Sequence, residues 1–385
     1  MPVRHADRPA TKPQFSAAEL RELHEKGTEI LKHLESRGLY KPLGSYRAQP
    51  EDGKVTYGEG YPITAFEKFL GYWKKDANLA FSPSISMVTD FSVVRCFCRY
   101  VREPGRDKVF LDGESNERYD KRARKALDNF RSITGITGSF EFTIERVKRY
   151  DKAKGLGESA AVAAATARAL IANVFGEDAA HDDIFVSRFA RFASGSGTRS
   201  AAGGMSIWIA FPEIEESQSY ACRLDVDTSN FHFAVFPDFH NIQTMDAHGI
   251  ASSSPFYPTW VINKYDRILK LIKSGPKIED LMRNAQEDMF FLRSLLTSGG
   301  VIIDTERSIK LINAVKSFQQ SGGNIFMTAD TGPSIVVMST DEGELKRFIA
   351  TQSAKPLYGK IPQSVNYSPD PKAAHTASAF LESLR

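Results

Sequence analysis

A glycine-rich turn between a strand-like segment and a long alanine-rich stretch constrains this chain more than any other feature. Residues 155–161 read Gly-Leu-Gly-Glu-Ser-Ala-Ala, and they follow the alternating segment Phe140–Ile144. Alternation predicts a strand, and the alanines of 159–175 predict a buried helix, because small side chains let it approach a sheet closely. Glycine exposes backbone N–H groups, and a helix N-terminus adds roughly half a positive charge. This arrangement therefore predicts a cradle for a phosphate group.

Glu158 conflicts with that role, because a carboxylate placed in the cradle repels the phosphate that it should hold. At a separation of about 4 Å and an effective dielectric near 20, the repulsion between two unit charges is about 4 kcal/mol. The alternative is a tight strand-to-helix connection, in which Glu158 stabilises the positive end of the helix. The residues of the turn alone leave both interpretations open.

The composition indicates a folded protein without a general attraction for polyanions. The chain has 385 residues, of which 42% are hydrophobic and 25% charged, so it can bury the cores of two domains or three. Its 50 basic and 47 acidic residues give a net charge of +3, which provides no broad basic surface. No apolar run approaches the ~20 residues that span a bilayer. We therefore expect neither nucleic acid nor a membrane as a partner.

The N-terminus and the cysteines predict a cytoplasmic protein. The first residues, Met-Pro-Val-Arg-His-Ala-Asp, lack the apolar core of a signal peptide. The chain has three cysteines, a number that suits a reducing compartment. Two of them, Cys96 and Cys98, share one face of an expected strand and are predicted to be core residues. His232, Asp238 and His240 match no standard metal-ligand spacing, so no metal site is expected.

Periodicity along the chain predicts a mixture of helices and strands. A capping box of Ser16 and Glu19 begins a helix over 16–38, and a loop rich in Gly, Pro and Tyr follows to about Pro62. Strands are expected at 80–87, 92–101, 108–111, 139–147, 205–210, 231–236, 324–328 and 334–338. Further helices are expected at 119–130, 159–175, 183–192, 259–273, 278–296 and 305–320, and a last one from about Asp341.

This order of elements predicts an α/β (α+β) body. Helices cluster late in the chain, which favours two domains, at 56–225 and 226–385, preceded by an extension, 1–55, with one helix. The segment 193–204 is expected to form neither helix nor strand, because it is rich in glycine and serine.

Two further loops carry residues of chemical interest. Residues 194–204 read Ser-Gly-Ser-Gly-Thr-Arg-Ser-Ala-Ala-Gly-Gly, and the planar guanidinium of Arg199 is suited to a carboxylate or a phosphate. Residues 328–334 read Thr-Ala-Asp-Thr-Gly-Pro-Ser between two expected strands. The first loop is either a binding loop or a flexible connection. Asp330 in the second is either a functional carboxylate or an Asx-turn former.

Taken together and in this order, the three loops resemble the mevalonate diphosphate decarboxylases of the GHMP kinase superfamily. The glycine turn is common to the superfamily, whereas the block around Arg199 is specific to the decarboxylases. Fainter similarities lie at 72–76 with 84–86, and at 252–255, so the resemblance covers about residues 60–340. It implies a two-domain GHMP-kinase-like fold with the active site in the cleft between the domains.

The resemblance also implies a reaction and its residues. The reaction removes CO₂ from a phosphorylated mevalonate and gives an isopentenyl phosphate. Asp330 is implied beside C3 of the substrate, and Arg199 at the substrate carboxylate. The implied substrate- and phosphate-binding residues are Ser194, Ser196, Ser200, Gly155, Gly157, Ser159, Lys74 and Ser254. The family is often dimeric, so a homo-oligomer is expected.

Several departures from the family pattern concern the nucleotide. The family has serine, near the nucleotide phosphates, where Glu158 stands. Its Lys-Tyr-Trp-Gly-Lys segment corresponds to 70–74 here, Leu-Gly-Tyr-Trp-Lys, with no lysine at the first position. The arginine that usually follows Thr-Ser-Pro falls at Trp260, and the extension 1–55 is additional.

These departures favour a variant known from Thermoplasma-type archaea. In that variant a separate kinase installs the 3-phosphate, and the decarboxylase acts on mevalonate 3,5-bisphosphate without ATP, so no cofactor is expected. The alternatives are a decarboxylase of mevalonate 5-phosphate or 5-diphosphate that uses Mg-ATP, a mevalonate 3-kinase-like enzyme, and a ligand sensor without turnover. Arg188 and Arg191, one helical turn apart, are further candidates for a phosphate. The basic residues of 146–154 are expected to attract a doubly phosphorylated substrate.

Overall fold

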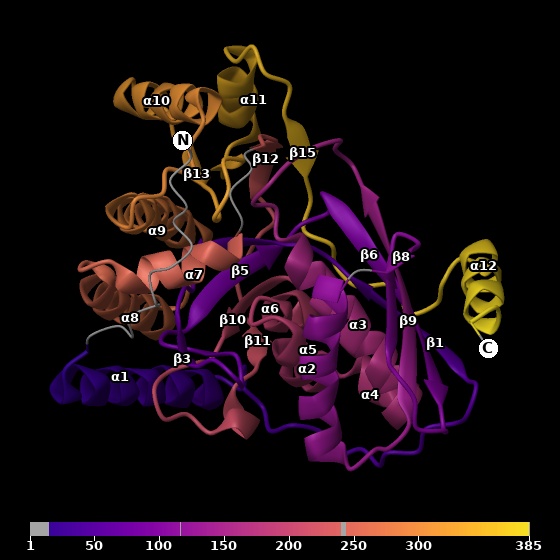
Figure 1. Ribbon diagram of the computed structural model, residues 1–385. Coiled ribbons are helices and arrows are strands. Elements are labelled where there is room, and N and C mark those ends of the chain that lie inside the picture. Colours follow the sequence, from indigo (N-terminus) through magenta and orange to yellow (C-terminus); the bar gives the residue numbers. More distant parts are fainter. Residues whose placement is uncertain (1–14, 116, 240–243, 385) are drawn as a thin grey trace, which may run out of the picture.

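The computed structural model describes residues 15–115, 117–239 and 244–384 (Figure 1). The helices are α1 (Ala17–Ser36), α2 (Glu117–Thr134), α3 (Glu158–Phe175), α4 (Glu177–His181), α5 (Asp183–Ala193), α6 (Gly197–Ala202), α7 (Thr244–Ser253), α8 (Tyr257–Ser274), α9 (Ile278–Ser298), α10 (Glu306–Gln320), α11 (Glu342–Ala350) and α12 (Pro371–Glu382). The strands are β1 (Val55–Gly60), β2 (Ile63–Glu67), β3 (Tyr72–Lys74), β4 (Leu79–Ala80), β5 (Ser84–Val88), β6 (Ser92–Val101), β7 (Lys108–Leu111), β8 (Glu114–Ser115), β9 (Ser139–Lys148), β10 (Met205–Trp208), β11 (Ala221–Arg223), β12 (His232–Phe236), β13 (Phe326–Thr328), β14 (Ile335–Ser339) and β15 (Leu357–Gly359).

Three larger sheets organise the molecule. The first has the strand order β1-β6-β9-β7-β8, and β7 runs parallel to β9 while the other neighbours are antiparallel. The second, β11-β10-β5-β2, and the third, β13-β14-β12-β15, are antiparallel throughout. The expected mixture of helices and sheets is confirmed.

The alanine-rich helix α3 packs on the first sheet at very short range. A Cβ added to Gly58 of β1 would lie 2.4 Å from the Ala165 carbonyl oxygen, and one added to Gly60 would lie 2.4 Å from that of Ala161. Glycine in the strand and alanine in the helix therefore permit backbone-to-backbone contact. The prediction of a buried helix is confirmed, and the contact fixes the start of α3 against the sheet.

The N-terminal helix α1 is part of the main core. Its capping box forms as predicted, with Ser16 and Glu19 bonding each other's backbone N–H. Leu23, Ile30 and Leu34 are fully buried in a cluster shared with β5, β10, α8 and α9. In Figure 1, α1 lies along α8.

The C-terminal segment returns from the third sheet to the first. After β15 pairs with β12, the chain runs past β6, and α12 packs on the outer side of β1 and β6. In Figure 1, α12 lies at the right edge, far from α11. Because α12 contacts the sheet of the first half, sequence order alone does not separate the two predicted domains, and the boundary at 225/226 stays a prediction.

Four local predictions are wrong, for identifiable reasons. Strand β1 lies inside the predicted loop. Its glycines suggested a loop, but they are there because α3 packs directly against the backbone of this strand. The predicted strand 80–87 is divided into β4 and β5 around Pro83, which lacks an N–H for a ladder. The segment 193–204 contains helix α6, whose residues are all buried. The helix near Asp341 is not the last, since α12 follows.

The structure also bears on the predictions made for two cysteines and for membrane-spanning segments. Cys96 and Cys98 are fully buried on β6 in one hydrophobic cluster, as predicted for core residues, and burial raises the pKa of Cys96 to about 12. Within the described ranges, no helix is long and apolar enough to cross a membrane.

Candidate active site

Asp330 lies in the turn between β13 and β14, at the edge of strand β2. Its Oδ1 accepts a hydrogen bond from the Ala65 N–H of β2 at 3.3 Å, and its side chain is half-buried. Burial raises the pKa of Asp330, while the nearby cations of Lys68 and Arg199 oppose that rise. The site thus contains a partly desolvated carboxylate that faces two cations from the first half of the chain.

Lys68, the residue after β2, supplies the first of these cations. It is 4% exposed, and its Nζ donates to Thr328 Oγ1 at 2.9 Å and to the Ala65 carbonyl at 3.1 Å. Burial lowers the pKa of Lys68, and the Asp288 and Asp330 carboxylates partly restore it. A lysine that is this buried is held by specific acceptors rather than by solvent.

Arg199 supplies the second cation, from the short helix α6. Its Nη1 donates to Ser86 Oγ of β5 at 2.5 Å, and its guanidinium carbon lies 5.5 Å from the Phe69 ring centroid. Burial lowers its pKa, and Asp330 opposes this effect. Its buried Nε has no acceptor among the described residues. The guanidinium is therefore desolvated, and the described residues leave one of its N–H donors without an acceptor.

Three serines gather at the N-terminus of α3. The hydroxyl oxygens of Ser194 and Ser196 are 2.8 Å apart, and that of Ser159 is 3.4 Å from Ser194 Oγ. Two separate stretches of sequence thus place hydroxyl donors beside the positive end of an 18-residue helix. This group can offer several hydrogen bonds to one anion.

The glycine turn is in backbone contact with the hairpin that carries Asp330. A Cβ added to Gly155 would lie 2.9 Å from Gly332 Cα, and one added to Gly332 would lie 2.6 Å from the Lys154 carbonyl oxygen. Gly157, with φ +71°, approaches the Ile63 carbonyl as closely, since its added Cβ would be 2.1 Å away. The turn therefore packs between β2 and the hairpin.

Glu158, the first residue of α3, is bound by three side chains of the β9 segment. Tyr150 donates its hydroxyl to Oε1, Lys148 Nζ lies 3.2 Å from Oε1, and Arg146 Nη1 lies 3.5 Å from Oε2. Basic residues that were expected to attract substrate phosphate are thus engaged by a carboxylate of the chain itself. Arg149 likewise pairs with Asp90.

Comparison with known proteins places the chain in a family. Residues 60–221 match the model of the diphosphomevalonate decarboxylase-like N-terminal domain. A mevalonate 3,5-bisphosphate decarboxylase of Thermoplasma acidophilum is 45% identical over 333 residues, which are 86% of this chain and 82% of the relative. Another, of Thermoplasma volcanium, is 45% identical over 324 residues, 84% of this chain and 87% of the relative. The chain belongs to the mevalonate 3,5-bisphosphate decarboxylase family.

A solved structure agrees with this family at the level of the fold. The crystal structure of mevalonate diphosphate decarboxylase from Staphylococcus aureus has a TM-score of 0.69 and covers 80% of this chain and 96% of its own. Its sequence identity is 18%, so it shows the fold alone. The predicted GHMP-kinase-like fold of the decarboxylase is confirmed.

The structure brings to this site a lysine that the sequence analysis did not name. Lys68 stands two residues before 70–74, Leu-Gly-Tyr-Trp-Lys, the segment matched to the family's Lys-Tyr-Trp-Gly-Lys. Its Nζ bonds Thr328, and its charge acts on Asp330. The absence of a lysine from the first position of the matched segment stays a prediction.

Three predicted residues of the decarboxylase bond elsewhere. Lys74 Nζ pairs with Glu216 at 2.5 Å, and 57% of its side chain is exposed. Ser200 donates to the Tyr61 carbonyl at 2.6 Å, and the hydroxyl oxygens of Ser254 and Ser298 are 2.7 Å apart. Among the described side-chain hydrogen bonds and ion pairs, none joins these three to Asp330, Arg199 or the serines at α3.

Other candidates named from the sequence also have structural partners. Trp260 is buried, and its Nε1 donates to Asp288. Arg191 is fully buried and donates to the Glu216 carbonyl at 2.9 Å, while burial lowers the pKa of Arg188. His240 lies outside the described residues, and within them no group of three potential metal ligands occurs.

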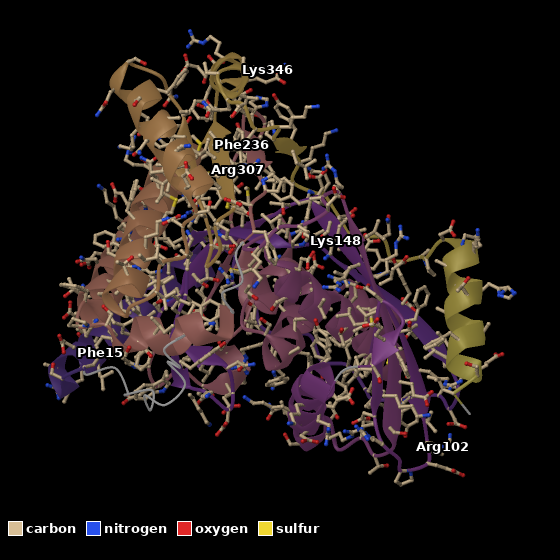
Figure 2. All side chains as sticks on the ribbon, turned by 45° about the horizontal axis from the view of Figure 1, so that its top comes forward. Phe15, Arg102, Lys148, Phe236, Arg307 and Lys346 are labelled. Carbon is tan, nitrogen blue, oxygen red and sulfur yellow. The ribbon has the colours of Figure 1, made fainter. Side chains whose placement is uncertain are left out.

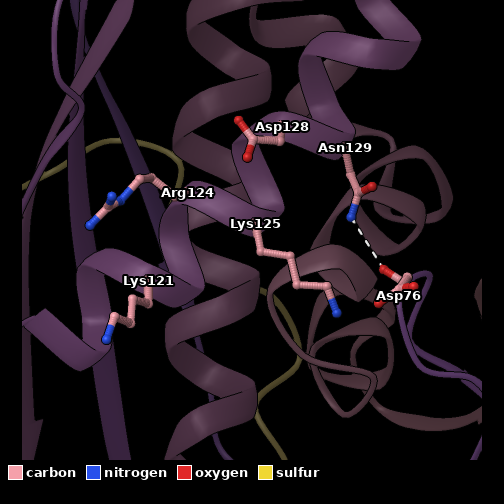
Figure 3. A pocket seen from close by; sticks show the side chains of 6 residues that line it. All are labelled: Asp76, Lys121, Arg124, Lys125, Asp128 and Asn129. Carbon is pink, nitrogen blue, oxygen red and sulfur yellow. Dashed lines mark hydrogen bonds between the residues drawn. The ribbon is translucent and has the colours of Figure 1, made fainter.

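A surface groove of about 450 Å³ on α2 contains none of the predicted site residues (Figure 3). It is lined by Asp76, Lys121, Arg124, Lys125, Asp128 and Asn129. Asn129 donates to the Asp76 carbonyl at 3.4 Å, and Lys125 donates to the Lys75 carbonyl at 2.9 Å. These bonds join α2 to the loop after β3.

Proposed function

We propose that the chain converts mevalonate 3,5-bisphosphate to isopentenyl phosphate, CO₂ and phosphate, and that it does so without a nucleotide. The observation that carries the proposal is the grouping of Asp330, Lys68 and Arg199 next to the serines at α3. The relatives named for this reaction are 45% identical to the chain.

The bond changes define what the site must stabilise. The bond between C3 and the phosphate oxygen breaks, and its electron pair leaves with the phosphate. Positive charge therefore builds at C3. The bond between the carboxylate carbon and C2 then breaks, its electron pair forms the C2=C3 double bond, and CO₂ departs. No oxidant, reductant or second substrate is required.

Asp330 stabilises the positive charge at C3 in this proposal. A carboxylate in a low-dielectric site acts more strongly on a developing charge than one in water. Lys68 and Arg199 favour the ionised form of Asp330, because each opposes the rise in its pKa that burial causes.

Arg199 holds the substrate carboxylate before it leaves as CO₂. Its guanidinium is fixed by Ser86 and by the ring of Phe69, and its buried Nε has no acceptor among the described residues. The departing 3-phosphate is bound by Lys68 and by the hydroxyls of Ser159, Ser194 and Ser196, because cations and hydroxyl donors stabilise the charge that accumulates on it.

Two features of the glycine turn support a reaction without a nucleotide. The turn is packed against the Asp330 hairpin, which occupies the space directly beside Gly155. Glu158 already binds Tyr150, Lys148 and Arg146, so these groups do not serve an external triphosphate. A leaving phosphate that is installed beforehand removes the need for ATP.

One incubation tests the proposal. The enzyme is supplied with mevalonate 3,5-bisphosphate in the absence of nucleotide, and CO₂, phosphate and isopentenyl phosphate are measured. We expect the three products in equal amounts. Turnover only of the 5-phosphate or 5-diphosphate with Mg-ATP contradicts the proposal, ADP release without CO₂ indicates a kinase, and binding without turnover indicates a sensor.

The oligomeric state and the cellular location of the enzyme are also part of the proposal. We expect a cytoplasmic homo-oligomer, as is common in the family. Sedimentation velocity of the purified chain measures the oligomeric state, and a monomer over the working concentration range contradicts this expectation.

A further inference from the structure

A cluster of buried charges lies directly behind Lys68, on the side of α8 and α9. We call it the rear charge cluster and define it as Glu67, Lys264, Arg267 and Asp288. The side chains of Glu67, Lys264 and Asp288 are fully buried, and that of Arg267 is 14% exposed. Burying four charged groups together is costly unless each is paired. The reaction as derived above uses none of them.

Asp288 of α9 receives hydrogen bonds from the residue after β2 and from side chains of α8. Its Oδ2 accepts the backbone N–H of Lys68 at 2.8 Å, and its Oδ1 accepts Trp260 Nε1 at 2.9 Å. Lys264 Nζ and Arg267 Nη2 lie 3.2 and 3.0 Å from the same Oδ1. These bonds fix the orientation of the carboxylate, and one of its oxygens, Oδ2, binds the main-chain N–H of Lys68.

Lys264 of α8 completes the hold on Lys68. Its Nζ donates to the Lys68 carbonyl and lies 3.9 Å from the Trp260 ring centroid. Both backbone polar groups of Lys68 are therefore bonded by buried charged side chains of helices distant in sequence. Lys68 is just outside the ladder of β2, so strand pairing does not fix its conformation. Glu67 and Arg267, bonded at 2.8 and 2.9 Å, complete the cluster.

We propose that Asp288 and Lys264 are positioning residues for the decarboxylation, because they fix the main chain of Lys68 and thereby place its ammonium beside Asp330. This inference rests on the proposed function, in which Lys68 acts on the departing phosphate. Asp288 also supplies the negative charge that keeps a buried ammonium protonated.

The charges around Asp288 determine the direction of the pH effect. The charged groups that act on it are Lys68, Glu67, Lys264, Arg267 and Asp330, while Arg293 of α9 acts on Lys68. Burial lowers the pKa of Lys68, and Asp288 is the strongest opposing influence. Activity that needs protonated Lys68 is lost as pH rises through this pKa. Removing the Asp288 charge must therefore shift that loss to lower pH.

The test is a pair of variants with opposite electrostatic effects. Asp288→Asn keeps an oxygen acceptor but removes the negative charge, so the alkaline limb of kcat/KM should move down by about one pH unit or more. We expect kcat at pH 8 to fall roughly tenfold, with a smaller change in KM. Lys264→Gln removes a positive charge, so it should lower kcat without a downward shift of that limb.

Glu141→Gln is the matched control. Glu141 of β9 accepts hydrogen bonds from Arg99 of β6, both side chains are buried, and no described contact joins either of them to Lys68. This variant should lose stability while its pH profile matches that of the wild type. A folded Asp288→Asn enzyme whose alkaline limb and kcat equal those of the control overturns the proposal. If Asp288→Asn does not fold, a Lys264→Gln enzyme with wild-type kcat overturns it instead.

A readout without substrate separates this inference from the proposed function. NMR titration of the Lys68 ε-methylene reports its pKa directly in the wild type and in both variants. A downward shift in Asp288→Asn supports the inference even if mevalonate 3,5-bisphosphate is not turned over, and an unchanged pKa in that variant contradicts it. Absence of wild-type turnover, in contrast, contradicts the proposed function alone.

Discussion

Asp330 illustrates how a single residue is prepared by groups from several elements. Its carboxylate accepts the Ala65 N–H of β2, faces Lys68 from the following segment, and faces Arg199 from α6. None of these partners is near it in sequence, and together they oppose the rise in its pKa that burial causes. Its role should therefore depend on charge more than on shape.

Asp330→Asn tests that dependence. The amide has nearly the same shape but no negative charge, so we expect turnover to fall about 100-fold or more while the protein still folds. Turnover of mevalonate 3,5-bisphosphate, together with circular dichroism and Tm, provides the measurement. Near-normal turnover in a correctly folded variant would remove Asp330 from the mechanism.

Individual residues differed in how well the sequence predicted their surroundings. Asp330 and Arg199 were found because each lies in a loop with a distinctive motif. Lys68 was missed, because only the fold brings it to Thr328 and Asp330. Asp288 lies in an ordinary amphipathic helix, and nothing in the local pattern distinguishes it from a solvated residue. Its role depends on a long-range contact, which periodicity does not report.

At the scale of elements, the contact between the glycine turn and the Asp330 hairpin connects two regions of the site. Gly332→Ala introduces a methyl group 2.6 Å from backbone atoms of Lys154, which cannot turn aside. Overpacking of this kind costs about 1–3 kcal/mol, so we expect a lower Tm together with reduced turnover. Gly105→Ala is the control, because its methyl group would meet the Ser139 hydroxyl at 3.2 Å and that side chain can rotate. Equal effects of the two substitutions would contradict this view.

The same contact bears on nucleotide binding. Glu158→Ser removes the carboxylate that binds Lys148 and Arg146, yet the hairpin still packs against Gly155. We therefore expect no tight binding of Mg-ATP by calorimetry, and turnover without nucleotide within a few-fold of wild type. Nanomolar ATP binding after this single change would show that charge alone excludes the nucleotide.

Regular elements with a clear period were predicted well, and elements defined by tertiary contact were not. Strands β6 and β7 begin and end as predicted, and α3 differs by one residue at its start. Helix α6 was missed, because glycine and serine disfavour a helix locally and only burial of residues 197–202 stabilises it. Strand β1 was missed for a related reason. Its glycines are typical of a loop, and only the close packing of α3 explains why they occur in a strand.

At the scale of the whole molecule, charged side chains are spread over the surface, and contacts between distant segments join the two halves of the chain. Figure 2 shows side chains on all elements, with Lys148 and Lys346 on separate parts of the body. The net charge of +3 is consistent with a surface that mixes signs. The two halves are also joined at several places, among them the core around α1 and the C-terminal segment 360–384.

The C-terminal segment provides the last prediction. Lys360 N–H donates to Asp90 at 2.8 Å, Asn366 N–H donates to the buried Glu59 at 3.1 Å, and Leu381 of α12 is fully buried against Tyr57 and Phe97. Deleting residues 360–385 removes a partner from Glu59 and exposes apolar surface on β1 and β6. Loss of one buried leucine alone costs about 2–5 kcal/mol, so Tm should fall clearly, and amide exchange should accelerate in β1 and β6.

Among the described contacts none joins this segment to Asp330, Lys68 or Arg199. Turnover at low temperature should therefore persist, and an unchanged Tm would show that the segment does not join the halves energetically.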